Sequence, residues 1–280
     1  MAWLDREGGQ IYYEYHGRDL PAECLRVVLS HGFGMSCRVW DNTTAKLLDA
    51  GYAVVVYDQR GCGHSTKDFS DVGVDVQGDD LVALCAATGA AGLVLNGWSF
   101  GGAVVVDAAE KLGERLCGLV STAGATPRYT QSDGFAHGGM AADVVATVDA
   151  LRADRVNFLQ ALYFEGVFAQ PVSAAVKQWC LDIALQASPA ADAALGALAE
   201  VDQRAALADL TCPALFVVGT ADGVVDPQIG RFAAAAAPHG QLAEMPECGH
   251  APFLEAADAY HASLLKFLHG IQAGRNAGTA

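Results

Sequence analysis

Short apolar runs rich in β-branched residues alternate along this chain with longer segments whose apolar residues recur at helical spacing. Strands buried on both faces are continuous apolar runs, and helices between them carry the chain back across the sheet. We therefore predict an α/β fold, with a mostly parallel sheet flanked by helices. The predicted parallel strands are residues 26–30, 53–57, 92–96, 118–121, 214–218 and 241–245. The predicted helices are residues 39–50, 76–88, 100–112, 228–236 and 256–268.

Two parts of the chain depart from this alternation. Residues 2–5 and 10–15 flank the turn Glu7-Gly8-Gly9, which predicts an antiparallel hairpin at the start of the sheet. Between residues 121 and 214 there is far more chain than a crossover helix requires, with aromatic residues concentrated in its middle. We expect a helical cap at 127–206, inserted into a core formed by 1–126 and 207–271. The small, polar stretch 272–280 is predicted to be a flexible tail.

Composition excludes several classes of protein. The chain is 52% hydrophobic and 18% charged, so it is not intrinsically disordered. Its net charge of -15 disfavours a nucleic-acid partner. Charged residues lie where a signal peptide needs its apolar stretch, and no apolar run approaches the roughly 18 residues of a membrane span. Eight cysteines without a CxxC pair indicate reduced thiols, so we expect a cytoplasmic protein with no membrane partner.

The most specific motif is Gly97-Trp98-Ser99-Phe100-Gly101-Gly102, between a predicted strand and a predicted helix. It has the G-x-S-x-G pattern in which a serine lies on a sharp strand-to-helix turn. Glycines are needed there because neighbouring backbone comes too close for side chains, and the helix N-terminus favours developing negative charge. The alternative is a glycine-rich turn that only packs tightly. The first interpretation identifies Ser99 as a candidate nucleophile.

A serine nucleophile needs a base within hydrogen-bond reach, and histidine titrates in a suitable range. Of the eight histidines, His250 follows the last predicted strand, so its loop emerges at the same edge of the sheet as Ser99. A carboxylate must orient the imidazole, and Asp222 directly follows the strand 214–218. The chain order Ser99, Asp222, His250 fits this architecture. Asp226 is the rival, although Pro227 after it suggests a helix N-cap.

Acyl transfer also needs N–H donors that stabilise an oxyanion. We expect these from Phe100, the residue after the nucleophile, and from Phe33 in the loop His31-Gly32-Phe33-Gly34, which follows a predicted strand. Aromatic residues around the nucleophile and in the cap predict an apolar pocket. The predicted substrate-binding residues are Trp98, Tyr163, Phe164 and Phe168.

Together these motifs resemble those of the α/β-hydrolase superfamily, in the correct order and over nearly the whole chain. They are His31-Gly32-Phe33-Gly34, Asp58-Gln59-Arg60-Gly61-Cys62-Gly63-His64-Ser65, Gly97-Trp98-Ser99-Phe100-Gly101-Gly102, and Gly219-Thr220-Ala221-Asp222 with Gly249-His250. Within the superfamily the chain is similar to pimeloyl-carrier-protein methyl esterases and to cofactor-free haloperoxidase/perhydrolase-type esterases. The resemblance implies an α/β-hydrolase fold of eight strands with a helical cap after the sixth. It also implies structural roles for Asp58 and Arg60.

We predict a serine hydrolase that cleaves a carboxylic ester of a small or medium apolar substrate through an acyl-enzyme intermediate. Open alternatives are a lactonase or perhydrolase using the same triad, a hydroxynitrile lyase, a cofactor-free oxygenase, a hormone-type receptor and a non-catalytic member. No cofactor or metal is expected, because no dinucleotide or P-loop motif is present. The expected partner is a small-molecule ester or lactone. A carrier-protein partner is not expected, because such a carrier is acidic and would be repelled by this acidic chain and its acidic cap.

Overall fold

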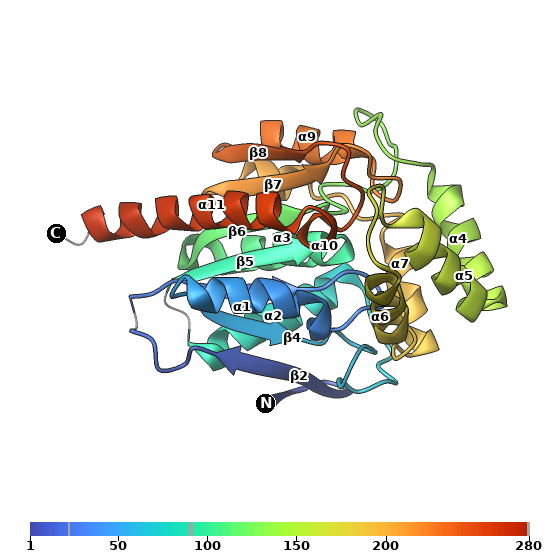
Figure 1. Cartoon of the computed structure of the whole chain (residues 1–280), viewed down its shortest axis with the longest axis horizontal. Coiled ribbons are helices and arrows are strands. Elements are labelled where there is room, and N and C mark those ends of the chain that lie inside the picture. The colour runs from blue at the N-terminus through green and yellow to red at the C-terminus, as the bar shows by residue number, and fades with distance from the viewer. Residues whose placement is uncertain (22, 90–91, 279–280) are drawn as a thin grey trace.

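One eight-stranded sheet forms the centre of the computed structural model, which describes residues 1–21, 23–89 and 92–278 (Figure 1). The order of strands across the sheet is β1-β2-β4-β3-β5-β6-β7-β8. The strands are β1 (Ala2–Arg6), β2 (Gly9–His16), β3 (Arg26–Ser30), β4 (Ala53–Tyr57), β5 (Leu93–Trp98), β6 (Leu116–Thr122), β7 (Ala214–Gly219) and β8 (Gly240–Met245). Each of the predicted strands is present.

The sheet starts as an antiparallel hairpin and continues as parallel strands. β1 pairs antiparallel with β2, with Trp3 opposite Tyr12, and β2 pairs antiparallel with β4. The remaining neighbours are parallel. This is the mostly parallel sheet that the alternating pattern predicts. Because parallel strands end at the same edge, the loops after β3, β5, β7 and β8 meet there.

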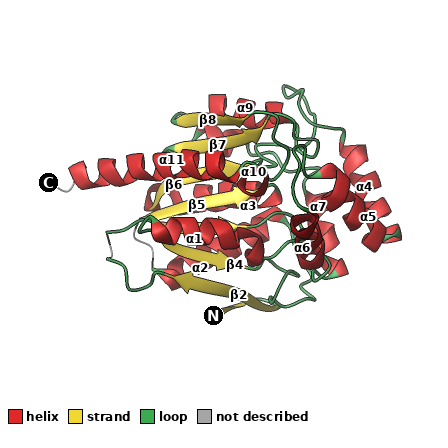
Figure 2. Cartoon of the chain, in the orientation of Figure 1, coloured by secondary structure: helices red, strands yellow, loops and turns green. Residues whose placement is uncertain are grey.

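Helices cover both faces of the sheet, as Figure 2 shows. In the view of Figure 1, α1 and α11 lie in front of the sheet, and α2 and α3 lie behind it. The helices are α1 (Asp41–Asp49), α2 (Val74–Thr88), α3 (Phe100–Leu112), α4 (Ala141–Ala153), α5 (Arg155–Ala161), α6 (Ala174–Ala184), α7 (Ala193–Ala197), α8 (Arg204–Ala208), α9 (Pro227–Ala236), α10 (Pro252–Glu255) and α11 (Ala257–Gly278).

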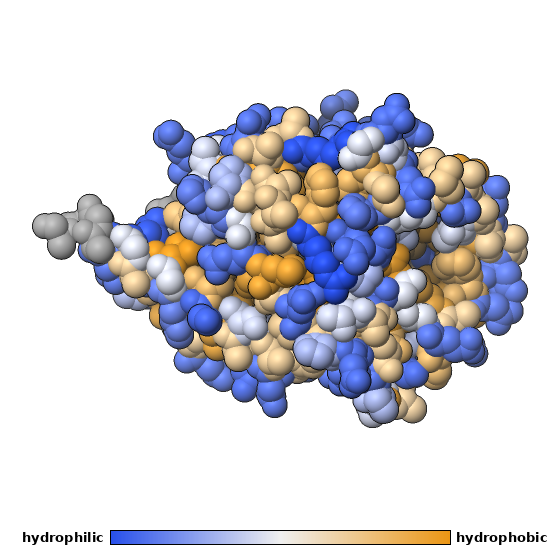
Figure 3. Space-filling model, turned by 90° about the horizontal axis from the view of Figure 1, so that it is seen from above, coloured by the Kyte–Doolittle hydropathy of each residue, from blue (hydrophilic) through white to orange (hydrophobic). Residues whose placement is uncertain are grey.

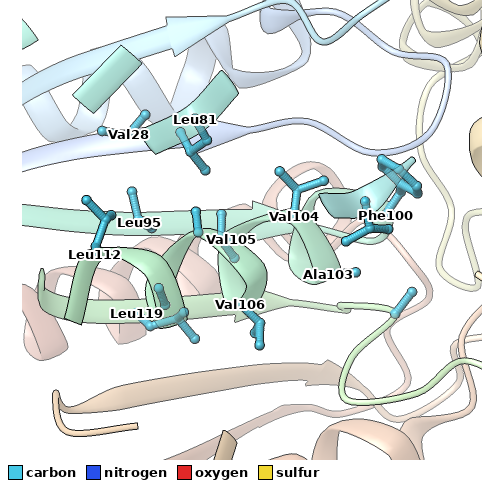
Figure 4. Close-up of a cluster of buried hydrophobic side chains, with 14 of the residues drawn as sticks. Val28, Leu81, Leu95, Phe100, Ala103, Val104, Val105, Val106, Leu112 and Leu119 are labelled. Atoms are coloured by element: carbon cyan, nitrogen blue, oxygen red, sulfur yellow. The ribbon is translucent and has the colours of Figure 1, made fainter. Parts of the chain in front are cut away.

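Alternate residues of the central strands enter different hydrophobic cores. In β3, Val28 belongs to the core that contains α2, α3 and α9, whereas Val27 and Leu29 belong to the core that contains α1 and α11. This follows from the two-residue period of a strand, and burial on both faces explains why the strands are continuous apolar runs. Figure 4 shows the first core, where α3 packs against the sheet. Its labelled side chains include Val104 and Val105 of α3 and Leu95 of β5.

The long insertion between β6 and β7 lies at the carboxyl end of the parallel strands, on the right in Figure 1. It contains α4 to α7 and a π-helical turn, Leu162–Gly166. Its two ends are joined, because the Gln203 N–H donates to the Pro127 carbonyl (2.8 Å) and the Thr126 hydroxyl donates to Gln203 Oε1 (2.8 Å). α8, which begins inside the predicted cap range, packs against α3 and α9. The helical insertion after the sixth strand is thus present.

The last helix is longer than its apolar pattern predicts. α11 continues to Gly278, through most of the stretch 272–280 that the sequence assigns to a tail, while residues 279–280 lie outside the described residues. Gln272 Oε1 accepts a hydrogen bond from the Leu25 N–H (3.2 Å), and Ile271 is buried in the core. The hydrogen bond to Leu25, just before β3, and the burial of Ile271 explain how a stretch of small and polar residues is held as helix.

Large apolar side chains that are exposed are spread over several elements, and the face seen in Figure 3 mixes hydrophilic with hydrophobic residues. Scattered exposure of this kind is ordinary for a folded protein. The exposed residues are Met1, Trp3, Met140, Val145, Val156, Leu185 and Leu242. None of the described helices has the length and apolar character needed to cross a membrane.

A buried ion-pair network joins the hairpin, the loop after β4 and α2. Asp80 of α2 is 2% exposed and accepts hydrogen bonds from Arg6 Nε (2.7 Å) and from Arg60 Nε and Nη2 (2.6 and 3.0 Å). The Arg60 guanidinium also lies over the Phe69 ring, 4.5 Å from its centroid. Arg60 therefore has a structural environment, as the family resemblance implies.

We predict that Asp80→Asn lowers the free energy of unfolding by about 3 kcal/mol, because it leaves a buried arginine without its charge partner. Asp79→Asn is the matched control on the same helix. Asp79 pairs with Lys111 but is 57% exposed, so its loss is expected to cost less than about 1 kcal/mol. Urea denaturation of the two variants tests this, and equal losses would contradict the structural role of Asp80.

Candidate active site

Ser99 is the single residue between the end of β5 and the start of α3. Its backbone has φ 55° and ψ -119°, a conformation that non-glycine residues rarely adopt and that surrounding structure must enforce. The Ser99 N–H donates to the Thr122 carbonyl (3.1 Å), and the Ser99 carbonyl accepts from the Ala125 N–H (2.9 Å). The end of β6 and the residues after it therefore hold Ser99 in this strained turn.

The glycines of the motif are required by close backbone packing. A Cβ atom on Gly97 would lie 2.1 Å from the Gly101 carbonyl oxygen, and one on Gly101 would lie 2.5 Å from the His31 carbonyl oxygen. The turn thus closes only if these positions lack side chains. The close approach of Gly101 to the His31 carbonyl also brings the loop after β3 against the start of α3.

His250 lies in the loop between β8 and α10 and is 3% exposed. Its Nδ1 lies 2.8 Å from Asp222 Oδ2. Asp222 Oδ1 accepts hydrogen bonds from the backbone N–H groups of Val224 (2.8 Å) and Val225 (3.0 Å). Because a carboxylate oxygen only accepts, this contact assigns the proton of the neutral ring to Nδ1 and leaves Nε2 as a proton acceptor.

The two aspartates that the sequence offered as partners for His250 have different surroundings. Asp226 is the N-cap of α9, where its side chain accepts from the Gln228 N–H (2.9 Å). Its second carboxylate oxygen accepts from the Gly138 N–H (3.0 Å). Asp222, and not Asp226, is therefore the aspartate that contacts His250.

Ser99 and His250 line one small cavity of about 90 Å³ beneath the insertion. Its lining contains no Asp, Glu, Lys or Arg among the described residues. Gly32, Phe33 and Trp98 also line it, so the loop after β3 reaches the nucleophile. The cavity is lined further by Ala125, Tyr129, Thr147, Phe158, Leu162, Tyr163, Val167, Leu195, Leu198, Val224 and Val225.

The two predicted oxyanion donors belong to the segments that close around Ser99. Phe100 is the first residue of α3, where a backbone N–H has no acceptor within the helix. The Phe33 loop is braced by His31, whose Nδ1 lies 2.8 Å from the Gly32 carbonyl and whose Nε2 accepts from the Gln59 N–H (2.9 Å). Burial lowers the pKa of His31, which keeps the ring neutral in this role.

Two of the four predicted substrate-binding residues line the cavity, and two lie elsewhere. Trp98 and Tyr163 are in its lining. Phe164 and Phe168 are not, and pack instead as partly buried residues against the core that contains α1 and α11. The insertion presents Phe158 and Leu162 to the cavity in their place. Phe158 and Leu162 are four residues apart and so lie on one face of a helix. This spacing is the feature of the sequence that could have identified them.

Comparisons with known proteins agree with this fold. A model of the alpha/beta hydrolase family matches residues 27–262. A pimeloyl-[acyl-carrier protein] methyl ester esterase from Aliivibrio salmonicida is 29% identical over 252 residues, which cover 86% of this chain and 91% of that protein. Among solved structures, a bromoperoxidase from Bacillus anthracis is 27% identical, with a TM-score of 0.88 over 96% of this chain and 99% of its own.

An esterase from Exiguobacterium antarcticum has a similar backbone, with a TM-score of 0.89 at 24% identity over 94% of this chain and 97% of its own. These likenesses confirm the α/β-hydrolase fold and the resemblances that the motifs indicate.

We predict that Gly97→Ala lowers the free energy of unfolding by about 3 kcal/mol, because the new methyl group overlaps the Gly101 carbonyl. Gly274→Ala in α11 is the control, since a Cβ there has no neighbour within 4 Å. It is expected to stabilise the helix by up to about 1 kcal/mol. Thermal and urea denaturation distinguish the two, and a neutral Gly97→Ala would show that the turn has room for a side chain.

Proposed function

Because this chain belongs to the alpha/beta hydrolase family, we propose that it is a serine hydrolase that cleaves a carboxylic ester through an acyl-enzyme intermediate. Ser99 is the proposed nucleophile, His250 the general base and Asp222 the residue that orients the histidine. The backbone N–H groups of Phe33 and Phe100 are the proposed oxyanion donors. The proposal needs no group from outside the chain except substrate and water.

The contact between His250 and Asp222 carries this proposal. An Nδ1–Oδ2 distance of 2.8 Å with both side chains almost wholly buried supports one ring orientation and one tautomer. Nε2 is then the basic nitrogen, and the imidazolium formed after proton transfer has a carboxylate partner. The cavity that Ser99 and His250 share supports their action on one bound substrate.

The proposed reaction has two steps. His250 removes the hydroxyl proton of Ser99 as Ser99 Oγ attacks the acyl carbon, and the two N–H donors stabilise the resulting oxyanion. The alcohol leaves with the proton from His250, and Ser99 remains acylated. Water, deprotonated by His250, then attacks the acyl carbon; the bond to Ser99 Oγ breaks, the carboxylic acid leaves, and His250 returns the proton to Oγ. The N-terminus of α3 lies next to the developing negative charge and favours it.

We predict that Ser99→Ala lowers kcat for p-nitrophenyl butyrate by on the order of 10⁶, which reduces it to background. Ser263→Ala in α11 is the matched control, because its exposed hydroxyl donates only to the Ala259 carbonyl within the helix. Circular dichroism establishes that both variants are folded. Equal activity in the two variants, or none in the wild type, would contradict the proposal. Covalent labelling of Ser99 without ester turnover would instead favour the lyase alternative.

The cavity also supports a preference for small or medium apolar groups. Its volume is about 90 Å³, and its described lining contains no Asp, Glu, Lys or Arg. A second cavity of about 440 Å³ lies beside it and shares part of its wall. The Tyr129 hydroxyl, in that wall, donates to the Val224 carbonyl (2.9 Å). The shared wall is formed by Tyr129, Thr147, Leu195 and Val224.

We predict that Leu195→Ala raises kcat/KM for p-nitrophenyl octanoate relative to the butyrate by about tenfold, because it opens the shared wall to a longer chain. Leu198→Ala is the matched control. It removes the same atoms from the inner cavity, but Leu198 does not line the outer one, so only a small shift is expected. The same shift in both variants would contradict a size limit set by the wall.

A further inference from the structure

One carboxylate connects the histidine loop, residues 246–251 between β8 and α10, to a segment in the middle of the insertion, beside the cavity. Glu255 is the last residue of α10, and its Oε1 accepts hydrogen bonds from the backbone N–H groups of Gly249 (2.8 Å) and Gln170 (2.7 Å). Both of its oxygens lie 3.2 Å from the Ala169 nitrogen. We call residues 167–170 the exit segment, because they follow the π-helical turn of the insertion. Glu255 therefore binds two segments that are far apart in sequence.

Backbone contacts join the same two segments directly. The His250 N–H donates to the Val167 carbonyl (2.7 Å), and the Gln170 side-chain amide donates to the Pro246 carbonyl (3.0 Å). A Cβ on Gly249 would lie 2.6 Å from the Val167 carbonyl oxygen. The exit segment and the histidine loop thus lie in backbone contact, and they separate only if these hydrogen bonds break.

Val167 belongs to this junction and to the cavity at once. Its carbonyl accepts from His250, and its residue lines the cavity that contains Ser99. A group bound in the cavity therefore contacts a residue that fixes the backbone of the proposed base. If the exit segment moves away from the histidine loop, this hydrogen bond breaks or His250 is displaced. A second group that keeps the two segments docked would prevent both outcomes.

We propose that Glu255 is a positioning residue for His250, which keeps the histidine loop docked on the exit segment of the cap. The inference rests on the proposed function, in which His250 is the general base. Glu255 touches neither Ser99 nor the reacting atoms, so it acts through the placement of His250. A carboxylate suits this role because charge-assisted hydrogen bonds are roughly twice as strong as neutral ones.

The test compares Glu255→Leu, which removes the acceptors, with Glu255→Gln, which keeps an Oε1 acceptor without the charge. For p-nitrophenyl butyrate, we expect Glu255→Leu to lower kcat by about 100-fold, as a misplacement of about 1 Å does, with KM changed less than threefold. The kcat of Glu255→Gln should be at least tenfold higher than that of Glu255→Leu. Glu244→Leu is the control, because Glu244 of β8 is exposed and pairs with Arg231.

Amide hydrogen exchange, followed by mass spectrometry of the folded proteins, separates this inference from the proposed function. We expect faster exchange at His250 and Gln170 in Glu255→Leu, but not in Glu244→Leu. Faster exchange with no esterase activity in the wild type would overturn the proposed function and leave the docking role supported. Unchanged exchange, or a lower melting temperature with unchanged kcat, would overturn the positioning role.

Discussion

Close packing of backbone around Ser99 is the constraint on which the candidate site depends. The strained turn exists because Thr122 and Ala125 hold the Ser99 backbone while Gly97 and Gly101 leave no side chain in the way. The absence of a side chain at Gly101 lets the start of α3 touch the carbonyl of His31. One packing requirement therefore brings the candidate nucleophile, the Phe100 N–H and the Phe33 loop into the same small volume.

The candidate base is fixed at its ring and at its backbone. Asp222 holds Nδ1 of His250, the Val167 carbonyl accepts from its N–H, and Trp98 Nε1 donates to its carbonyl (2.8 Å). Trp98 also precedes Ser99 in the chain, and its ring lies 5.5 Å from the His250 ring. The nucleophile and the base are thus connected through one tryptophan. A residue held at its ring and its backbone by three other residues loses little entropy when a substrate binds, which is what preorganisation requires.

Acidic side chains in this protein hold loops by accepting backbone N–H groups. Asp58 is fully buried and accepts from the N–H groups of Cys37 (2.7 Å) and His64 (2.6 Å). Asp222 and Glu255 have the same function in the loops around His250. A buried carboxylate is tolerated when several N–H groups satisfy it. A few of the acidic residues are therefore used inside the protein to hold loops, while the described lining of the cavity beside Ser99 contains no Asp, Glu, Lys or Arg.

The sequence by itself determined the order of strands and helices, and it identified Ser99, Asp222 and His250 as candidates. Strand burial and the glycine spacing of a tight turn are local properties, so they are readable without a structure. The sequence favoured Asp222 over Asp226 from its position directly after the strand, and the fold shows through their hydrogen-bond partners that Asp222 contacts His250 while Asp226 caps α9.

The tertiary structure alone decided which side chains of the insertion face the cavity. Phe164 and Phe168 are aromatic like Phe158 and Tyr163, yet the rotation of short helices and a π-helical turn directs only the latter two inward. The length of α11 and the hydrogen bonds of Glu255 to residues 169 and 170 could not be predicted from the sequence either. Their physical reason is the same: each depends on contacts between segments far apart in the chain, which local pattern does not encode.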